Sequence, residues 1–377
     1  MAAHHHLTPC PPHVYIHVPF CARRCSYCDF SIAVRKQVPA SRFVDAIKAE
    51  LATRGVGPSE GPVRSVYLGG GTPSKLGAAV SDITNLISTL SERSLAELGE
   101  VTVEANPEDI TAEIVRAWRA GGVNRVSLGV QSFDSAALDW MHRTHSVPQV
   151  FEAVKILNGE GIPRLSLDLI FALPDDLNRD WTRDLETAVS LEPGHVSVYG
   201  LTVEPHTPLG RWTDRGRVAG ASETRFEAEF LEADRRLGAA GFVHYEVSNY
   251  ARPGDHSRHN SAYWTGASYL GVGPSAHGFD GETRRWNARE YVRWLELVES
   301  GRDPMEGDET LWPAEVAAER VYLGLRTTSG LKATEVELHR AEPWIAEGWA
   351  RREGDHLVLT PQGWLRMDSL AAALASG

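Results

Sequence analysis

Three cysteines lie close together near the start of the chain, Cys21, Cys25 and Cys28. Thiolates are soft ligands that bind zinc, copper(I) and iron–sulfur clusters. Three of them on one loop can hold three corners of a tetrahedral centre and leave the fourth open for chemistry. Structural zinc uses four ligands, usually in two separated pairs, and only Cys10 is left over. The spacing therefore favours a cluster or a catalytic metal over structural zinc, and both over a disulfide.

A glycine run, Gly69-Gly70-Gly71-Thr72-Pro73, follows a strand-like segment at residues 64–68. Glycines at the end of a strand let a ligand approach the backbone and leave its amides and carbonyls free to bind it. The alternative, which the residues alone favour, is a tight turn into the next helix.

Four single polar residues follow other strand-like segments: Glu104, Gln131, Arg143 and Asp168. Alone, a carboxylate in such a place is often a helix cap or a solvated charge. Together the four could bind one polar ligand, because an arginine can form a fork with a carboxylate and Asp168 can accept hydrogen bonds from hydroxyl groups.

Six strand-like segments alternate with helical ones between residues 13 and 239. The strands are expected at 13–18, 64–68, 101–104, 125–129, 165–170 and 195–199. This alternation predicts an α/β fold with parallel strands and crossover helices. Since polar residues follow the strands, we expect a partial (β/α)6 TIM-like barrel with one site at the C-terminal strand ends. A doubly wound open sheet is the alternative, but its GxGxxG turn is missing after the first strand.

The regular alternation ends near residue 242. A strand at 242–247, a polar aromatic loop at 248–281 and helices at 312–325, 335–349 and 361–374 are expected. A short strand at 356–359 makes the C-terminal part winged-helix-like and mostly helical. Thirteen Asp/Glu against eight Lys/Arg from residue 301 onward indicate a lid or docking domain instead of a DNA binder. The predicted domains are a flexible N-terminus at 1–12, a barrel at 13–245, a connection at 246–286 and a helical domain at 287–377.

Composition narrows the class of protein further. The 377 residues carry a formal net charge of −12, which argues against a duplex nucleic-acid partner. Clustered cysteines suit a reducing cytoplasm and metal binding. The sequence shows neither an apolar run of membrane-spanning length nor a signal-peptide pattern, so a cytoplasmic location is expected.

The CxxxCxxC spacing resembles that of the radical S-adenosylmethionine (SAM) superfamily. The resemblance implies that Cys21, Cys25 and Cys28 hold a [4Fe–4S] cluster whose fourth iron is chelated by SAM. Reduction of the cluster then cleaves SAM to a 5′-deoxyadenosyl radical. Tyr27 matches the family's aromatic residue beside the adenine, and the glycine run matches the segment that binds the methionyl group.

The segments 128–133, 143–145 and 167–174 resemble one branch of this superfamily, the oxygen-independent coproporphyrinogen III oxidase-like proteins. The resemblance runs from Tyr15 to the C-terminus. It implies that seven residues surround the cluster-bound SAM: Tyr27, Gly71, Thr72, Gln131, Arg143, Asp168 and Gly200. Four others match a second pocket, which in the oxidase receives another SAM: Tyr15, Gly70, Glu104 and His277.

The segment His259-Asn260-Ser261-Ala262-Tyr263-Trp264 carries a histidine that can bind haem iron axially and two flat aromatic side chains. The residues alone favour a surface loop with a capped turn. However, HNxxYW resembles the haem-binding signature of the haem chaperone branch, which implies that His259, Tyr263 and Trp264 bind haem. His256 is a neighbouring alternative ligand.

Two departures separate the chain from the oxidase. Phe30 stands where the oxidase has a fourth cysteine, and only fourteen residues precede Tyr15. We therefore expect a haem chaperone with a SAM-ligated [4Fe–4S] cluster and without coproporphyrinogen III oxidase activity. The alternative is a radical SAM enzyme that decarboxylates a tetrapyrrole. The resemblance implies apo-haem proteins of the respiratory chain as acceptors, and leaves open a homodimer and peripheral contact with the inner face of the membrane.

Overall fold

The computed structural model describes residues 7–91 and 99–375, and its chain divides into two compact units. Unit 1 comprises Met1–Asp168, Thr202–Val218 and Ser268–Thr310. Unit 2 comprises Leu169–Leu201, Ala219–Ala267 and Leu311–Gly377. The border falls inside strand β9 (Arg164–Phe171), which gives residues to both units.

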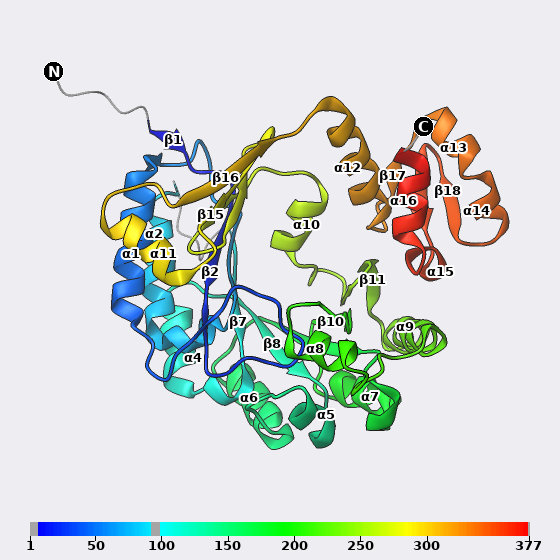
Figure 1. Cartoon of the computed structure of the whole chain (residues 1–377), viewed down its shortest axis with the longest axis horizontal. Helices are drawn as coiled ribbons and strands as arrows, with labels where there is room; N and C mark the ends of the chain where they lie inside the picture. Colours follow the sequence, from blue (N-terminus) through cyan, green and yellow to red (C-terminus); the bar gives the residue numbers. More distant parts are fainter. Residues whose placement is uncertain (1–6, 92–98, 376–377) are drawn as a thin grey trace. The chain divides into compact units, whose positions relative to one another are not determined.

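Unit 1 is built on a mainly parallel sheet (Figure 1). Its strand order is β13-β2-β6-β7-β8-β9. The strands are β2 (His13–Val18), β6 (Ser65–Gly70), β7 (Glu100–Ala105), β8 (Arg125–Gln131), the first part of β9, and β13 (Leu270–Val272). Helices follow these strands: α1 (Ala40–Thr53), α2 (Val80–Ser88), α4 (Ala112–Ala120), α5 (Ser135–Trp140) and α6 (Val147–Gly159). The pairs β13–β2, β2–β6, β6–β7 and β7–β8 are all parallel.

Alternation along the strands explains why these residues form a sheet with helices packed on it. Val14, Ile16 and Val18 of β2 are fully buried, and α1 buries Phe43 and Ile47 at helical spacing. Register then sets the positions of the polar side chains. Tyr15 of β2 stands opposite Tyr67 of β6, and Val18 stands opposite Gly70. The C-terminal ends of neighbouring parallel strands therefore meet at one edge, as the sequence predicts.

Unit 2 contains the end of β9, β10 (His195–Gly200), β12 (Asn249–Ala251) and β11 (Val243–Glu246), the last three paired antiparallel in that order. Its helices include α7 (Trp181–Ser190), α9 (Glu223–Ala239) and α10 (Arg258–Trp264). Its C-terminal part surrounds the three-stranded sheet β17-β19-β18. Those strands are Leu331–Lys332, His356–Leu359 and Ala350–Glu353, and the helices are α12 (Pro313–Leu325), α13 (Glu335–Arg340), α14 (Glu342–Ala346), α15 (Pro361–Trp364) and α16 (Met367–Ala375).

The six predicted strand–helix units are present, but three local expectations were wrong. The polar loop predicted at 248–281 contains helix α10 and strands β13 and β14 (His277–Phe279). Strand β16 (Met305–Thr310) lies inside the part expected to be helical from residue 287. It follows helix α11 (Tyr291–Glu299) and pairs antiparallel with β15 (Thr283–Asn287), and its polar residues show no strand alternation. The helix predicted at 335–349 is interrupted at Ala341, just before Pro343. The domain borders predicted from the sequence stay predictions.

No helix in the described part of the chain is both long and apolar enough to cross a membrane.

Candidate cofactor site and haem motif

The three clustered cysteines lie beyond the end of β2, beside two other loops of unit 1. All three are free thiols; Cys21 is buried, and Cys25 and Cys28 are half-buried. The Cys21 Sγ lies 3.4 Å from the Thr72 hydroxyl, and Arg143 Nη1 donates to Cys25 Sγ at 3.5 Å. The structure therefore gathers the cysteine loop, the glycine run and Arg143, which are far apart in the sequence.

Burial raises the pKa of the Cys28 thiol to about 11 and also raises that of Cys21. Bound iron or zinc requires thiolates, so ligation must release these protons. Among residues 7–91 and 99–375, no three His, Cys, Asp or Glu side chains converge closely enough to hold a single metal ion. A single zinc ion needs every thiolate about 2.3 Å from one centre, whereas each cysteine of an iron–sulfur cluster binds a different iron.

Arg143 is half-buried at the centre of this site. Its Nη2 donates to Asn106 Oδ1 at 2.6 Å and to the Gly129 carbonyl at 3.0 Å. Burial opposes the charged form, but Tyr27, Cys25 and Glu108 together raise the pKa of Arg143 above its usual value. The Arg143 Nε is buried without a hydrogen-bond partner among the described residues. The site thus keeps a fixed positive charge with one unused donor, which suits a carboxylate.

The glycine run is required by packing. A Cβ at Gly71 would lie 2.7 Å from the Pro19 backbone, and one at Gly70 would lie 2.6 Å from the His17 ring. Gly70 also has a φ of +111°, which side chains disfavour. The close approach of β2 to the glycine run is therefore enough to explain the glycines, and it positions Thr72 beside Cys21.

Tyr15, Gly70 and Glu104 lie together on this edge. The Tyr67 hydroxyl donates to Glu104 Oε1 at 2.7 Å, the Gly70 amide donates to Oε2 at 3.0 Å, and Tyr15 stacks on Tyr67 with ring centroids 6.2 Å apart. Burial raises the pKa of Glu104 to about 7, although these two hydrogen bonds lower it. This carboxyl therefore titrates near neutral pH.

Gln131 ends β8, and Asp168 lies within the neighbouring strand β9. A Cβ on Gly129 would lie 3.1 Å from Gln131 Nε2 and 3.2 Å from Arg143 Nη2, so these two side chains flank the same glycine. The Ser127 hydroxyl lies 2.9 Å from both carboxylate oxygens of Asp168. Gly200 belongs to unit 2, where a Cβ would lie 2.6 Å from Phe226.

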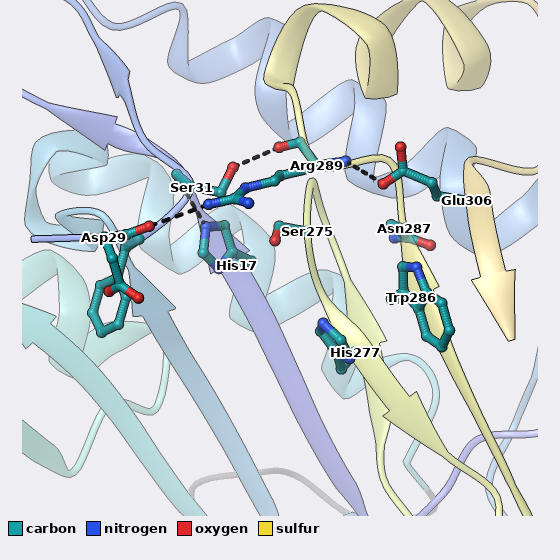
Figure 2. A pocket seen from close by; sticks show the side chains of 10 residues that line it. His17, Asp29, Ser31, Ser275, His277, Trp286, Asn287, Arg289 and Glu306 are labelled. Carbon is teal, nitrogen blue, oxygen red and sulfur yellow. Dashed lines mark hydrogen bonds between the residues drawn. The ribbon is translucent and has the colours of Figure 1, made fainter. Parts of the chain in front are cut away.

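His277 lines a separate cavity of about 420 Å³ in unit 1 (Figure 2). Its ring stacks on Trp286, with centroids 5.8 Å apart. The other lining residues are His17, Asp29, Phe30, Ser31, Ser275, Asn287, Arg289 and Glu306. The cavity adjoins the Tyr15 group through His17, whose Nδ1 lies 3.1 Å from the Tyr15 hydroxyl and whose Nε2 lies 3.0 Å from the Ser31 carbonyl.

Sequence reasoning missed His17 and Asn106. A signal existed for His17, because it stands two residues after Tyr15 in a strand and therefore shares its face. For Asn106, which holds Arg143, the only signal was its place just after β7.

The haem motif forms helix α10, with the Ser257 hydroxyl accepting from the Asn260 amide at its start. His259 and Tyr263 are four residues apart and share one helix face, and the His259 Nε2 lies 2.8 Å from the Tyr263 hydroxyl. His259 is only 1% exposed. Trp264 packs under the Arg326 guanidinium at 4.2 Å, and the alternative ligand His256 stacks on Tyr245 at 4.2 Å. The motif residues are thus together, but in a closed arrangement.

Comparison with known proteins identifies close relatives. Residues 15–188 match the radical SAM superfamily. The chain is 38% identical to heme chaperone HemW of Mycobacterium tuberculosis (strain ATCC 25618 / H37Rv), covering 96% of this chain and 94% of the relative. Heme chaperone HemW of Escherichia coli (strain K12) is 33% identical, with 96% and 97% covered. The solved structure of E. coli coproporphyrinogen III oxidase (HemN) has a TM-score of 0.79 at 20% identity, covering 98% of this chain and 91% of that one, which supports the fold.

These similarities confirm the predicted α/β fold of radical SAM type with its C-terminal domain. The superfamily implies a [4Fe–4S] cluster and SAM, and the residues present fit both groups. Three free thiols lie on one loop, and the buried Nε of Arg143, which has no partner among the described residues, leaves a donor for a carboxylate. The chain belongs to the HemW family of the radical SAM superfamily.

Proposed function

We propose that this protein is a haem chaperone, which binds haem and transfers it to apo-haem proteins. The observation that carries the proposal is the HNxxYW motif, whose histidine and tyrosine are brought side by side on α10. A neutral imidazole binds haem iron axially, and aromatic side chains cover a porphyrin face. The similarity to relatives named heme chaperone HemW, which extends over most of their length, supports this function.

In this proposal the resident cofactors occupy unit 1. Cys21, Cys25 and Cys28 hold the cluster, which when reduced supplies the means to cleave SAM. Arg143 binds the SAM carboxylate through its unused Nε donor, and Asp168 accepts from the ribose. The other proposed SAM residues are Tyr27, Gly71, Thr72, Gln131 and Gly200, with Tyr15, Gly70, Glu104 and His277 assigned to the second pocket.

Haem binding at His259 requires a change in α10. The imidazole is 1% exposed and its Nε2 faces the Tyr263 hydroxyl, so the iron must displace that contact. Tyr263 and Trp264 then become available to the porphyrin. A site that must open before it binds reduces the apparent affinity by the fraction of open molecules.

The test is a hemin titration of the purified chain, followed by its Soret absorbance, with His259→Ala and His256→Ala compared. We expect His259→Ala, which removes the axial ligand, to weaken hemin binding about a hundredfold. His256→Ala should bind hemin as the wild type does. An unchanged affinity in His259→Ala would refute the assignment. A loss confined to His256→Ala would move the axial ligand to that residue.

The second candidate function is oxidative decarboxylation of coproporphyrinogen III, favoured by the intact cysteine cluster and by the Arg143 site. Phe30, which stands where the oxidase has its fourth cysteine, is 58% exposed on the rim of the His277 cavity. Reduced, cluster-reconstituted protein is incubated anaerobically with SAM and coproporphyrinogen III. Stoichiometric protoporphyrinogen would establish the enzyme, and its absence agrees with a chaperone.

We also propose specific acceptors, a membrane contact and a homodimer. Acceptors are apo-haem proteins of the respiratory chain, reached from the cytoplasm by peripheral contact with the inner face of the membrane, and two chains associate as a homodimer. We also propose the domain borders 13–245, 246–286 and 287–377. Size-exclusion chromatography with light scattering tests the dimer, and flotation with anionic vesicles tests the membrane contact.

A further inference from the structure

Helix α10 is tied at its two ends to two segments of unit 2 that pair with each other. At its start, the Ser257 amide donates to the Tyr245 hydroxyl at 3.3 Å. At its end, Trp264 lies under the Arg326 guanidinium at 4.2 Å. Tyr245 belongs to β11, and Arg326 follows α12, so two distant parts of the sequence hold one short helix. His259 lies between these two ties.

The backbone fixes the place from which Arg326 reaches Trp264. The Val247 amide donates to the Arg326 carbonyl at 3.1 Å, and the Thr328 amide donates to the Tyr245 carbonyl at 3.1 Å. The segment at 326–328 is therefore paired with the end of β11. The Arg326 side chain also pairs with Glu246, with 3.3 Å between Nε and Oε2.

The hydrogen bonding around the contacts of Arg326 with Trp264 and Glu246 is incomplete. Glu246 is fully buried, and neither its Oε2 nor the Arg326 Nε has a properly aligned hydrogen bond to a described residue. The indole Nε1 of Trp264 is likewise buried without a partner in the described part of the chain. With Asn249 Oδ1 and Tyr250 OH from the adjoining β12, five buried polar atoms here lack a well-aligned hydrogen bond to any described residue. Each unmade hydrogen bond destabilises the closed form, which makes it a region suited to rearrangement.

Resting on the proposed haem-binding function, we propose that Arg326 is a positioning residue that controls access of haem to His259. In the closed form its guanidinium holds Trp264 by a cation–π contact and holds Glu246 by the ion pair. Haem can reach His259 only when Trp264 leaves the guanidinium and α10 moves. Arg326 thus sets the fraction of molecules open to haem without touching the haem itself.

The experiment is stopped-flow mixing of hemin with the full chain, followed at the Soret band. Arg326→Gln should take up hemin about tenfold faster, because the cation–π contact and the ion pair that hold the closed form are both lost. Its final spectrum should match the wild type, since His259 is intact. Arg326→Lys keeps the charge and should return the rate close to that of the wild type.

Two further variants separate this role from loss of structure. The double variant Glu246→Gln/Arg326→Gln leaves no unpaired buried charge and should be as fast as Arg326→Gln. Arg320→Gln is the matched control, because Arg320 lies on α12, which ends just before Arg326, and its side chain pairs with Glu337. This variant should keep the wild-type rate.

Equal uptake rates in wild type, Arg326→Gln and the double variant would overturn the proposal. So would an equal acceleration in Arg320→Gln, which would indicate general loosening of the C-terminal part. Failure of the proposed haem function is distinguishable from both, because the wild type would then show no hemin binding that depends on His259.

Discussion

The cysteine site of unit 1 and the haem motif of unit 2 differ in their readiness to bind. At the cysteine site the thiols are free, Cys25 and Cys28 are partly accessible, and the buried Nε of Arg143 is a donor that no described residue uses. At the haem motif the histidine expected to bind iron is 1% exposed and paired with Tyr263. The first arrangement is preorganised and the second is closed.

This difference matches the roles proposed for the two ligands. A resident cofactor gains affinity when its site is already formed, since little ordering is needed on binding. A ligand that is transferred to another protein is released more easily from a site where contacts within the chain compete with it, because those contacts form again when the ligand leaves. If the two sites are independent, a change at one should leave ligand binding at the other intact.

Replacement of a clustered cysteine should have the largest effect. Cys28→Ala removes one of three ligands, so we expect near-complete loss of iron and sulfide from anaerobically reconstituted protein. Cys10→Ala, at a buried thiol whose pKa burial raises to about 11, is the control and should keep both. Hemin binding should survive Cys28→Ala. Its loss would show that the haem motif depends on the cluster and that the two sites are not separate.

Arg143→Gln should have the next largest effect, on SAM. Loss of the half-buried guanidinium removes a charge-assisted partner of the carboxylate, which costs about 2–3 kcal/mol, or close to a hundredfold in affinity. Equilibrium binding of SAM to the reconstituted protein measures this. Arg24→Gln is the control, because Arg24 is exposed and donates to the Cys28 carbonyl at 3.3 Å. Unchanged SAM affinity in Arg143→Gln would contradict a preorganised carboxylate site.

The sequence predicted unit 1 better than the haem motif for a physical reason. Strands such as β2 alternate buried Val14, Ile16 and Val18 with polar residues, and α1 places Phe43 and Ile47 at helical spacing. These periodicities arise from the core itself, so they are visible in one chain. Because the strands are parallel, polar residues that follow them lie at one edge of the sheet. Glu104, Arg143 and the cysteines are gathered there.

The haem motif lacked such a signal. Helix α10 has only seven residues, with His259 and Ala262 buried, which is too short for a recognisable apolar period. Its one local sign was the Ser257 cap. The contact between Trp264 and Arg326 joins residues 62 positions apart, and only the folded chain reveals it.

The pH dependence of stability tests the environment of Glu104 in unit 1, where the cysteine site lies. Burial raises its pKa from 4.5 to about 7, so between these values the folded chain binds more protons than the unfolded chain. Its contribution to stability therefore falls as pH rises through this window. In Glu104→Gln this fall is absent, and the variant should gain on the order of 2 kcal/mol relative to wild type between pH 5 and pH 8.

Urea unfolding of both proteins at the two pH values measures the Glu104 difference. Only its change with pH is used, because glutamine also alters the hydrogen bond from the Gly70 amide. Asp139→Asn, at an exposed residue of α5, is the control for removal of a carboxylate elsewhere on the chain. A constant difference between wild type and Glu104→Gln would mean that the carboxyl is ionised throughout the range, and that this edge is more open to water than its burial indicates.

Tyr263→Phe should have the smallest effect and probes the closed haem motif most directly. The variant keeps the aromatic ring but removes the hydroxyl that lies 2.8 Å from the His259 Nε2. A net hydrogen bond of about 1 kcal/mol then no longer competes with the iron, so hemin affinity should rise about fivefold. Tyr322→Phe, at an exposed tyrosine of α12, is the control and should leave the affinity unchanged. A fall in affinity in Tyr263→Phe would mean that the hydroxyl serves the bound haem, and that the motif is prepared for its ligand in the same way as the cysteine site.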